Sequence, residues 1–526
     1  MKRQILFWLV LISLPLPALA HIGSPNVFFE GRAGPYPVRV TVRPPGVIPG
    51  LAEVSVRVQS GNVQRVAALP IRWNLGKKGA PPPDEALPVR GETNLYSAEL
   101  WFMQSGAESV EVQITGDRGP GSVIVPINAI ALRRLAMPKF LGWLFVFLGT
   151  LLVALGVTVV SAAIRQSVLP PGAKPDMHKR WRFRIGTALV VIFFLAHLFL
   201  GKRWWDSEDA DFRNNRLYRP LETVAQTLVQ NGERVLRVSI EDEKYRHAEN
   251  VPPFVPDHGK LMHLFLVREP QMDAFAHLHP VKLDRVTFQT VLPDLPAGSY
   301  RVYADMTFES GFTITITAPT QIPDAPEKIA GNESIRSSFD PDDSWQVSEP
   351  LGVAKQNDSR NENETTIRLS PEFSMTWLRN GPLTENRDSH LRFAVRDASG
   401  QLVQLEPYMG MLSHAALRRD DGAVFTHLHP SGTVSMAALQ LFALRGEGKL
   451  PLAAALGKDD PICKLPTVEE SQQEWLKMNK PDGDFSFSFP YEFPKLGRYR
   501  LWVQVKIHGR VFTGVFDTMV RGAGES

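Results

Sequence analysis

Residues 275–280 read Phe-Ala-His-Leu-His-Pro, and residues 425–430 repeat this stretch as Phe-Thr-His-Leu-His-Pro. A single histidine precedes each copy, His263 in the first case and His414 in the second. Neutral imidazole binds transition metals, and three imidazoles on one face supply most of a coordination shell. The repeat therefore predicts a metal-handling protein, whose candidate ligands are His263, His277, His279, His414, His427 and His429.

The spacing within each copy predicts a β-hairpin. Side chains alternate along a strand, so His427 and His429 share one face. The dipeptide Asp421-Gly422 is a strong signal for a two-residue hairpin turn. With that turn, Ala416 pairs with His427 and His414 with His429, and directly paired side chains lie about 4.5–5.5 Å apart. Each trio is expected to converge, the first around a loop that is one residue longer, and each is expected to form its own site.

Methionines near the second trio bear on the choice of metal. Met409 and Met411 lie just ahead of His414 in the sequence Tyr-Met-Gly-Met. Thioether sulfur is soft and favours Cu(I), whereas imidazole also suits zinc and Cu(II). Copper is therefore the predicted metal, and zinc remains an alternative.

The N-terminus is typical of a secretory signal peptide, residues 1–20. Lys2 and Arg3 precede an apolar run, and Ala18-Leu19-Ala20 resembles a cleavage site. Cleavage would leave His21 as the first residue. Its free amine and imidazole could then chelate copper together, which makes His21 a further candidate ligand.

Two later apolar stretches predict transmembrane helices, at residues 141–164 and 185–203. The segment between them, residues 165–184, carries six Lys or Arg residues and one acid, Asp176, which is typical of a cytoplasmic loop. With an exported N-terminus, this predicts a protein of the bacterial inner (plasma) membrane whose N- and C-terminal domains both lie in the periplasm.

Net charge and cysteine content argue against several functions and structural features. The net charge of +3 is too small to indicate nucleic-acid binding. The only cysteine, Cys463, excludes an intrachain disulfide framework and a cysteine-based metal site.

The extracytoplasmic segments are expected to be mainly β, as three β-sandwich, immunoglobulin-like domains. Alternating stretches such as Val38-Arg39-Val40-Thr41-Val42, bounded by Pro and Gly, predict strands. The expected boundaries are 21–135 for the first sandwich, 223–320 for the second, 324–365 for a linker, and 366–522 for the third sandwich with an insertion at 435–484. The insertion is interpreted as decoration of the fold rather than a lid.

The second and third sandwiches share a further pattern. Gly298-Ser299-Tyr300-Arg301 matches Gly497-Arg498-Tyr499-Arg500, each after a turn. The tyrosine in this position is typical of a corner that fixes the end of a sandwich. The two domains are therefore interpreted as an internal repeat.

These motifs, with Met262-His263-Leu264-Phe265, resemble the YtkA-like domain, a small extracytoplasmic β-sandwich related in fold to CopC-type copper-binding proteins. The resemblance covers the second sandwich and, around its insertion, the third. It implies metal binding, with copper by association, and defines no reaction.

The leading hypothesis is a membrane-anchored periplasmic protein that binds copper and buffers it or passes it to a partner, such as a copper-handling or respiratory membrane complex. The first alternative is a zinc or copper metalloenzyme, for which Glu406 and Asp305 are candidate general bases. The second is a metal-free envelope scaffold or sensor. The absence of a clear general base favours a binding protein over an enzyme.

Overall fold

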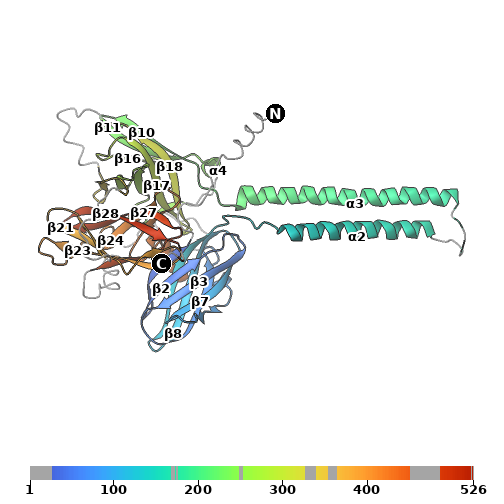
Figure 1. Ribbon diagram of the computed structural model, residues 1–526, viewed down its shortest axis with the longest axis horizontal. Helices are drawn as coiled ribbons and strands as arrows, with labels where there is room; N and C mark the ends of the chain where they lie inside the picture. The colour runs from blue at the N-terminus through green and yellow to red at the C-terminus, as the bar shows by residue number, and fades with distance from the viewer. Residues whose placement is uncertain are drawn as a thin grey trace. The chain divides into compact units, whose positions relative to one another are not determined.

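The computed structural model describes residues 26–166, 176–247, 253–325, 339–352, 364–450 and 486–522, together with 172, 174 and 524. Across these residues the fold is mainly β, with six sheets and two long apolar helices, and the predicted fold class is confirmed (Figure 1). The chain divides into two compact units. One holds all the sheets (Met1–Ile130 and Arg219–Ser526), and the other holds the two long helices (Ala131–Tyr218).

The first sandwich has one sheet of five strands and one of four. Its buried residues alternate along the strands, as in β3, where Ala52, Val54, Val56 and Val58 point into the core. In sheet order, the strands are β1 (Val27–Ala33), β2 (Tyr36–Arg43), β3 (Gly50–Val58), β7 (Leu95–Phe102) and β6 (Leu87–Pro88), and then β5 (Asp84–Glu85), β4 (Val63–Arg72), β8 (Gly106–Gly116) and β9 (Gly119–Ala129), with the short 3-10 helix η1 (Lys77–Gly79).

The second sandwich packs a four-stranded sheet against a six-stranded one around a single apolar core. The first sheet runs β10 (Thr223–Gln230), β11 (Glu233–Ile240), β16 (Thr287–Val291), β15 (Val281–Lys282). The second runs β12 (Phe254–Val255), β17 (Gly298–Phe308), β13 (His263–Arg268), β14 (Ala274–Leu278), β19 (Ser344–Val347), with β18 (Thr313–Ile322) also paired to β17; the short helix α4 (Glu243–His247) follows β11.

The third sandwich repeats this plan. One sheet runs β20 (Glu364–Arg368), β21 (Phe373–Leu378), β23 (Asp388–Asp397), β26 (Phe487–Glu492). The other runs β22 (Leu383–Thr384), β28 (Arg510–Arg521), β27 (Gly497–Ile507), β24 (Ser413–Arg419), β25 (Phe425–Leu428), and helix α5 (Met436–Gly446) follows β25.

The predicted tyrosine corners are confirmed in both sandwiches. The hydroxyl of Tyr300 donates to the carbonyl of Pro296 at 2.8 Å, and that of Tyr499 donates to the carbonyl of Lys495 at 2.6 Å. Both tyrosine residues are fully buried, and each hydroxyl is satisfied by this hydrogen bond. Each therefore fixes the turn that leads into β17 or β27, the central strands of their sheets.

The predicted linker, residues 324–365, is partly wrong. Residues 344–347 form β19, which adds an edge strand to the second sandwich by pairing with β14. The last two linker residues already belong to β20. Four residues carry too short an alternation to indicate a strand, and the polar composition around them concealed it.

The helical unit contains α2 (Lys139–Gln166) and α3 (Met177–Asp211), which lie side by side (Figure 1) and are followed by a π-helical turn, η2 (Phe212–Arg216). Ser161 of α2 and Thr187 of α3 are hydrogen-bonded at 2.9 Å. The predicted second span of 185–203 was too short. Helix α3 begins at Met177, because the side chain of Asp176 caps it by accepting from the backbone N–H of Lys179. Part of the predicted basic loop is therefore helical.

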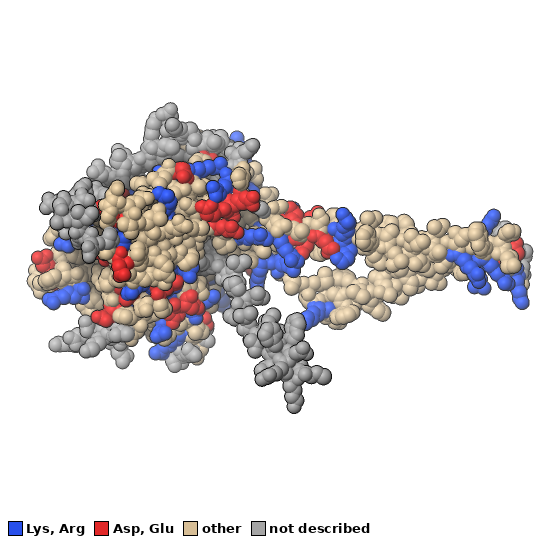
Figure 2. All heavy atoms as spheres, turned by 90° about the horizontal axis from the view of Figure 1, so that it is seen from above, with Lys and Arg blue, Asp and Glu red and all other residues tan. Residues whose placement is uncertain are grey.

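Both helices are long and apolar enough to cross a membrane. Their apolar side chains are exposed rather than packed in a core, as with Leu152, Val159 and Phe199. Figure 2 shows an apolar middle section of this helical pair with charged side chains toward its ends. A surface of this kind is stable in lipid, not in water, so the unit indicates membrane association.

Candidate metal centre

Two equivalent hairpins carry the histidine trios. In the second, Ala416 pairs with His427 and the ladder ends at Ala415 opposite Leu428. In the first, Phe265 pairs with His277 and the ladder ends at Leu264 opposite Leu278. The predicted register is confirmed up to these ends. The ligand atoms of each trio lie within 4.8 Å of one another, as expected for convergent side chains.

Each trio forms its own convergent group, and the expectation that each binds its own ion stays a prediction. The two sandwiches also dock on each other through these hairpins. Phe275 stacks on Trp502 with ring centroids 4.7 Å apart, and Phe425 stacks on Tyr303 at 3.9 Å. Each pair joins a hairpin phenylalanine of one sandwich to a central-strand aromatic residue of the other. This reciprocal exchange gives the interface an approximate two-fold relation and a buried apolar middle.

Docking brings both trios into one cluster beside the aromatic pairs. The rings of His263 and His427, which belong to different sandwiches, lie 5.4 Å apart, and those of His277 and His427 lie 5.6 Å apart. A seventh histidine, His258, joins them at 5.2 Å from His414 and 5.1 Å from His429. All seven side chains are buried or nearly so.

In the first trio, the outer nitrogen of every ring faces an oxygen atom. Nε2 of His263 lies 3.1 Å from the carbonyl of Asp257. Nδ1 of His277 lies 3.0 Å from Oε1 of Gln504, whose amide nitrogen donates to Ser344. Nδ1 of His279 lies 2.9 Å from Oδ1 of Asp343, which also accepts from the backbone N–H of His279. These oxygens accept, so the outer nitrogens carry the protons.

The second trio follows the same rule in two of its three rings. Nε2 of His414 lies 3.1 Å from the carbonyl of Tyr408. Nδ1 of His427 lies 3.4 Å from Oδ2 of Asp305. Among the described residues, both ring nitrogens of His429 lack a partner at hydrogen-bonding geometry.

The inner nitrogens of each trio face one another, and in the first trio this assignment leaves both of them without a proton. Nδ1 of His263 lies 3.1 Å from Nε2 of His277, and Nδ1 of His414 lies 3.2 Å from Nε2 of His427. Two lone pairs at this separation repel unless a cation lies between them. With a transition-metal ion about 2.0–2.1 Å from both nitrogens, the nitrogen–metal–nitrogen angle would be roughly 100°. That angle is within the range of ordinary metal geometry. In proteins that bind metals through histidine, hydrogen bonds of this kind from the outer ring nitrogen to an oxygen atom orient the ring.

Burial keeps these imidazoles neutral. Loss of solvation lowers the pKa of His263 to about 4 and that of His429 to about 3. The pKa values of the other four trio histidines are also lowered by burial and by the neighbouring rings. Neutral imidazole is the form that binds metals, so the cluster is ready to coordinate without first losing protons.

Acidic residues surround the cluster from several elements. Asp343 comes from the predicted linker, and burial raises its pKa to about 7. Asp305 lies on β17, where it also accepts from Thr315, and burial raises its pKa to about 7 as well. Asp257 accepts from the backbone N–H of Ala437 in the first turn of α5. The start of the predicted insertion therefore packs against the site and is not mere decoration.

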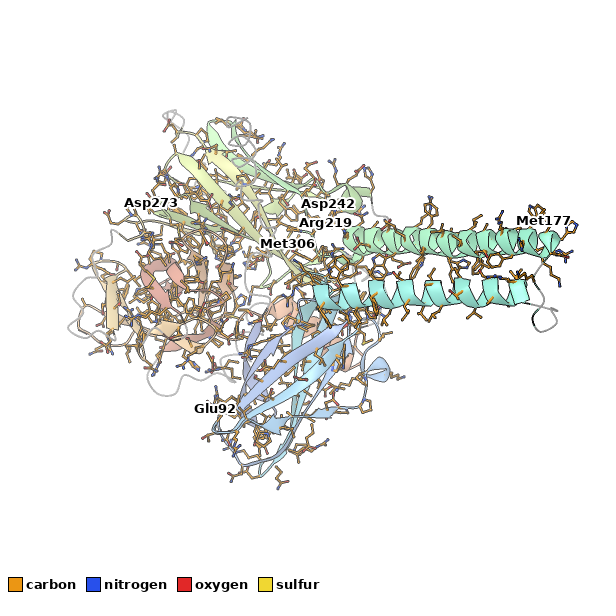
Figure 3. All side chains as sticks on the ribbon, turned by 45° about the vertical axis from the view of Figure 1, so that its right-hand side comes forward. Glu92, Met177, Arg219, Asp242, Asp273 and Met306 are labelled. Carbon is orange, nitrogen blue, oxygen red and sulfur yellow. The ribbon has the colours of Figure 1, made fainter. Side chains whose placement is uncertain are left out.

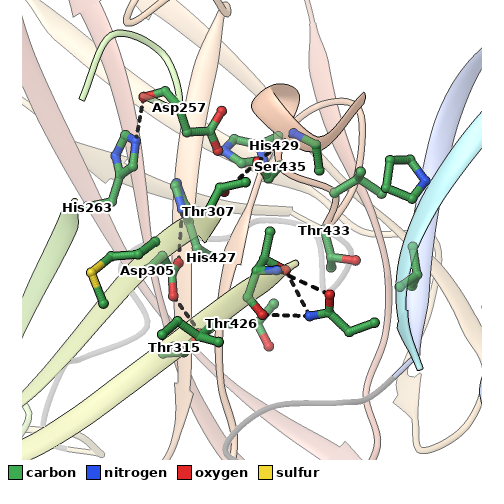
Figure 4. A pocket seen from close by; sticks show the side chains of 18 of the residues that line it. Asp257, His263, Asp305, Thr307, Thr315, Thr426, His427, His429, Thr433 and Ser435 are labelled. Atoms are coloured by element: carbon green, nitrogen blue, oxygen red, sulfur yellow. Dashed lines mark hydrogen bonds and ion pairs between the residues drawn. The ribbon is translucent and has the colours of Figure 1, made fainter. Parts of the chain in front are cut away.

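A cavity of about 160 Å³ adjoins the cluster. Figure 4 shows Asp257, His263, Asp305, His427 and His429 along its wall. Residues of the first sandwich, among them Val27 and Asn128, line the same cavity. All three sandwiches thus contribute to the space through which a small solute would reach the histidines.

The first sandwich is fixed to the loop that follows His429. The backbone N–H of Glu30 donates to the carbonyl of Ser431 at 2.9 Å, and that of Thr433 donates to the carbonyl of Phe28 at 2.9 Å. Phe28 is buried in the core of the third sandwich. Strand β1 therefore holds the loop in place next to the site.

The other predicted ligands have different outcomes. Met409 and Met411 are buried in the turn whose Tyr408 carbonyl faces His414. His21 lies outside the described residues. Sequence reasoning missed His258, Gln504 and Asp343, and it placed Asp305 only as a candidate base. Asp257-His258-Gly259 precedes His263 at the same distance as Tyr408-Met409-Gly410 precedes His414, and this alignment could have revealed His258.

Comparison with known protein families finds one model that matches part of the chain. Residues 221–322 and 371–449 match the model of a "Domain of unknown function (DUF8832)". The two matched segments contain one histidine trio each. No curated protein matches the chain.

Two of the solved structures that match are distant in sequence. One is the BSP domain of a biofilm associated protein, at 8% identity, with 98% of this chain and 68% of that chain covered and a TM-score of 0.14. Another is a protein from Corynebacterium diphtheriae described as membrane anchored, at 9% identity, with 95% and 96% covered and a TM-score of 0.12. At such TM-scores neither likeness supports a statement about fold or function.

Proposed function

We propose that this chain is a membrane-anchored extracytoplasmic protein that binds copper at the docked hairpins and buffers the ion or transfers it to a partner. The observation that carries the proposal is the pair of inward-facing ring nitrogens in each trio, 3.1 Å and 3.2 Å apart. Buried polar atoms that face each other without a proton destabilise a fold. A bound cation removes that cost and uses the same atoms.

The choice of copper rests on two supports. Met409 and Met411 lie in the turn that holds His414, and thioether sulfur favours Cu(I). The resemblance of the hairpins to the YtkA-like domain adds copper by association. Zinc suits the imidazoles equally well, and it would be favoured if neither sulfur reached the ion.

The membrane assignment combines the two apolar helices with the N-terminal signal pattern and the basic segment between the helices. Together they support an inner-membrane protein with its sandwiches in the periplasm. A copper-handling or respiratory membrane complex would be a suitable partner for an ion released there.

A metalloenzyme is the second candidate, because the cavity beside the cluster has room for a small substrate. Asp305 lines this cavity with a pKa raised to about 7 by burial, which suits a general base. Its side chain is also close to His427, so it serves equally well to orient that ligand.

The test uses the untagged full chain in detergent, freed of metal and titrated with Cu(I), Cu(II) and Zn(II) under chelator competition. We expect tight binding of at least one equivalent, and loss of at least tenfold in affinity when His277 and His427 are both changed to Gln. A matched control is His247→Gln, which alters an exposed histidine of α4. Folded wild-type protein that binds none of the three ions would refute the proposal, and turnover assays on the loaded protein would decide between binding protein and enzyme.

A further inference from the structure

His258 occupies the first central position of a tight turn. The turn is closed by reciprocal hydrogen bonds of 2.9 Å between Asp257 and Lys260. His258 has φ +52° and Gly259 has φ +79°, so both are in the left-handed region. Histidine, like Asn and Asp, tolerates this region better than most residues with a side chain. The turn therefore accommodates His258 but does not by itself specify an imidazole.

The side chain of His258 points into the histidine cluster. It is only 5% exposed, and its Nε2 is buried without a hydrogen-bond partner among the described residues. Its nearest acid is Asp257, at 3.8 Å from that nitrogen. A buried, unpartnered imidazole nitrogen next to other unpartnered imidazole nitrogens has the character of a metal ligand.

The ring of His258 lies nearer to the trio of the other sandwich than to its own. Its centroid is 5.2 Å from His414 and 5.1 Å from His429, but 6.0 Å from His263. Neither nitrogen of His429 is hydrogen-bonded to a side chain of the described residues, although the backbone of Val434 lies beside its ring. The second sandwich thus places an imidazole beside the incompletely satisfied trio of the third.

We propose that His258 is a metal ligand that joins His414, His427 and His429, so that both sandwiches hold one divalent transition ion, such as Zn(II) or Cu(II). The inference rests on the metal-binding function proposed above and assigns a fourth nitrogen to one half of the cluster. Because the four nitrogen donors would come from two sandwiches, binding of the ion would depend on the docking of the second sandwich on the third.

The equivalent turn of the third sandwich carries a different donor. Met409 has φ +48° and Gly410 has φ +83°, and reciprocal hydrogen bonds join Tyr408 to Met411. Met409 therefore stands where His258 stands in the other copy. A thioether prefers Cu(I), whereas an imidazole also binds Zn(II) and Cu(II). The two halves of the cluster consequently differ in the ion that they favour.

The experiment compares Zn(II) binding by the wild-type full chain, His258→Asn, His258→Met and His508→Asn, all in detergent. Asn tolerates the left-handed backbone and removes only the imidazole. His508 is the matched control: it has φ +50°, precedes Gly509 in a turn, and contacts Phe373 rather than the cluster. Melting temperatures establish that each variant is folded.

We expect His258→Asn to weaken at least one Zn(II) equivalent by tenfold or more, while His508→Asn binds like the wild type. His258→Met, which places the donor of the equivalent turn at this position, should weaken Zn(II) similarly but retain Cu(I). Unchanged Zn(II) affinity in both folded His258 variants would overturn this inference and leave the proposed function standing. Wild-type protein that binds no metal would overturn both.

Discussion

Asp305 and Gln504 hold equivalent places on β17 and β27, and each contacts a histidine of the opposite sandwich. Asp305 is paired with His263 across its own sheet but faces His427, while Gln504 is paired with His414 but faces His277. The two halves of the cluster thus have the same layout with different chemistry. A carboxylate makes its imidazole a stronger donor than a neutral amide does.

This difference predicts opposite effects for two single substitutions. Asp305→Asn should weaken metal binding about ten- to hundredfold, because the ring of His427 loses its orienting carboxylate. Gln504→Glu should strengthen binding, since it gives His277 the carboxylate that it lacks. Chelator competition with Zn(II) on the full chain measures the affinity of both variants. Each variant is the control for the other, because a general disturbance of the fold would weaken binding in both. Equal losses in both variants would show that these residues act only through packing.

Convergence within each trio could be predicted from the sequence because it depends on local rules. Strand alternation and the Asp421-Gly422 turn are enough to bring His414, His427 and His429 together. The close approach of the two trios, which results from docking of the second and third sandwiches, could not be predicted in this way. It depends on Phe275 meeting Trp502 and on Phe425 meeting Tyr303, contacts between residues far apart in the chain. His258 was missed because a turn residue belongs to no alternating pattern.

Among the elements, β1 has a role that its sequence does not reveal, since it fixes the loop after His429. Gly432 is in contact with this strand and has φ +112°. A Cβ atom at this position would lie far inside van der Waals contact with the carbonyl oxygen of Phe28. The close approach of the two backbones therefore requires glycine.

Gly432→Ala should lower the melting temperature of the full chain and expose β1 to proteolysis. Backbone strain at a positive φ costs about 1–3 kcal/mol, and here the clash with Phe28 adds to it. Gly91→Ala is the control, because Gly91 has φ +86° and open space around its Cβ position. Tryptophan fluorescence during heating measures the difference. If both variants melt alike, the contact of β1 with the loop contributes little to stability.

At the scale of the whole molecule, the sheets and the apolar helices require different solvents, and the distribution of charge predicts the topology of the chain in the membrane. Basic residues gather between α2 and α3, and Met177 lies at the start of α3 (Figure 3). Segments rich in Lys and Arg stay on the cytoplasmic side of a membrane. Every described histidine of the cluster belongs to the unit of sheets, which would then face the periplasm.

Cysteine labelling of intact cells tests this topology in a Cys463→Ser background. Met177→Cys should react with a membrane-impermeant maleimide only after permeabilisation, because it would lie at the cytoplasmic end of α3. Glu92→Cys, at an exposed position of the first sandwich (Figure 3), should react without permeabilisation. The side chain of Met177 is 84% exposed, so poor access within the fold would not explain its protection. Labelling of Met177→Cys from outside would place the cluster on the cytoplasmic side, where thiol-rich copper carriers rather than periplasmic partners would compete for its ion.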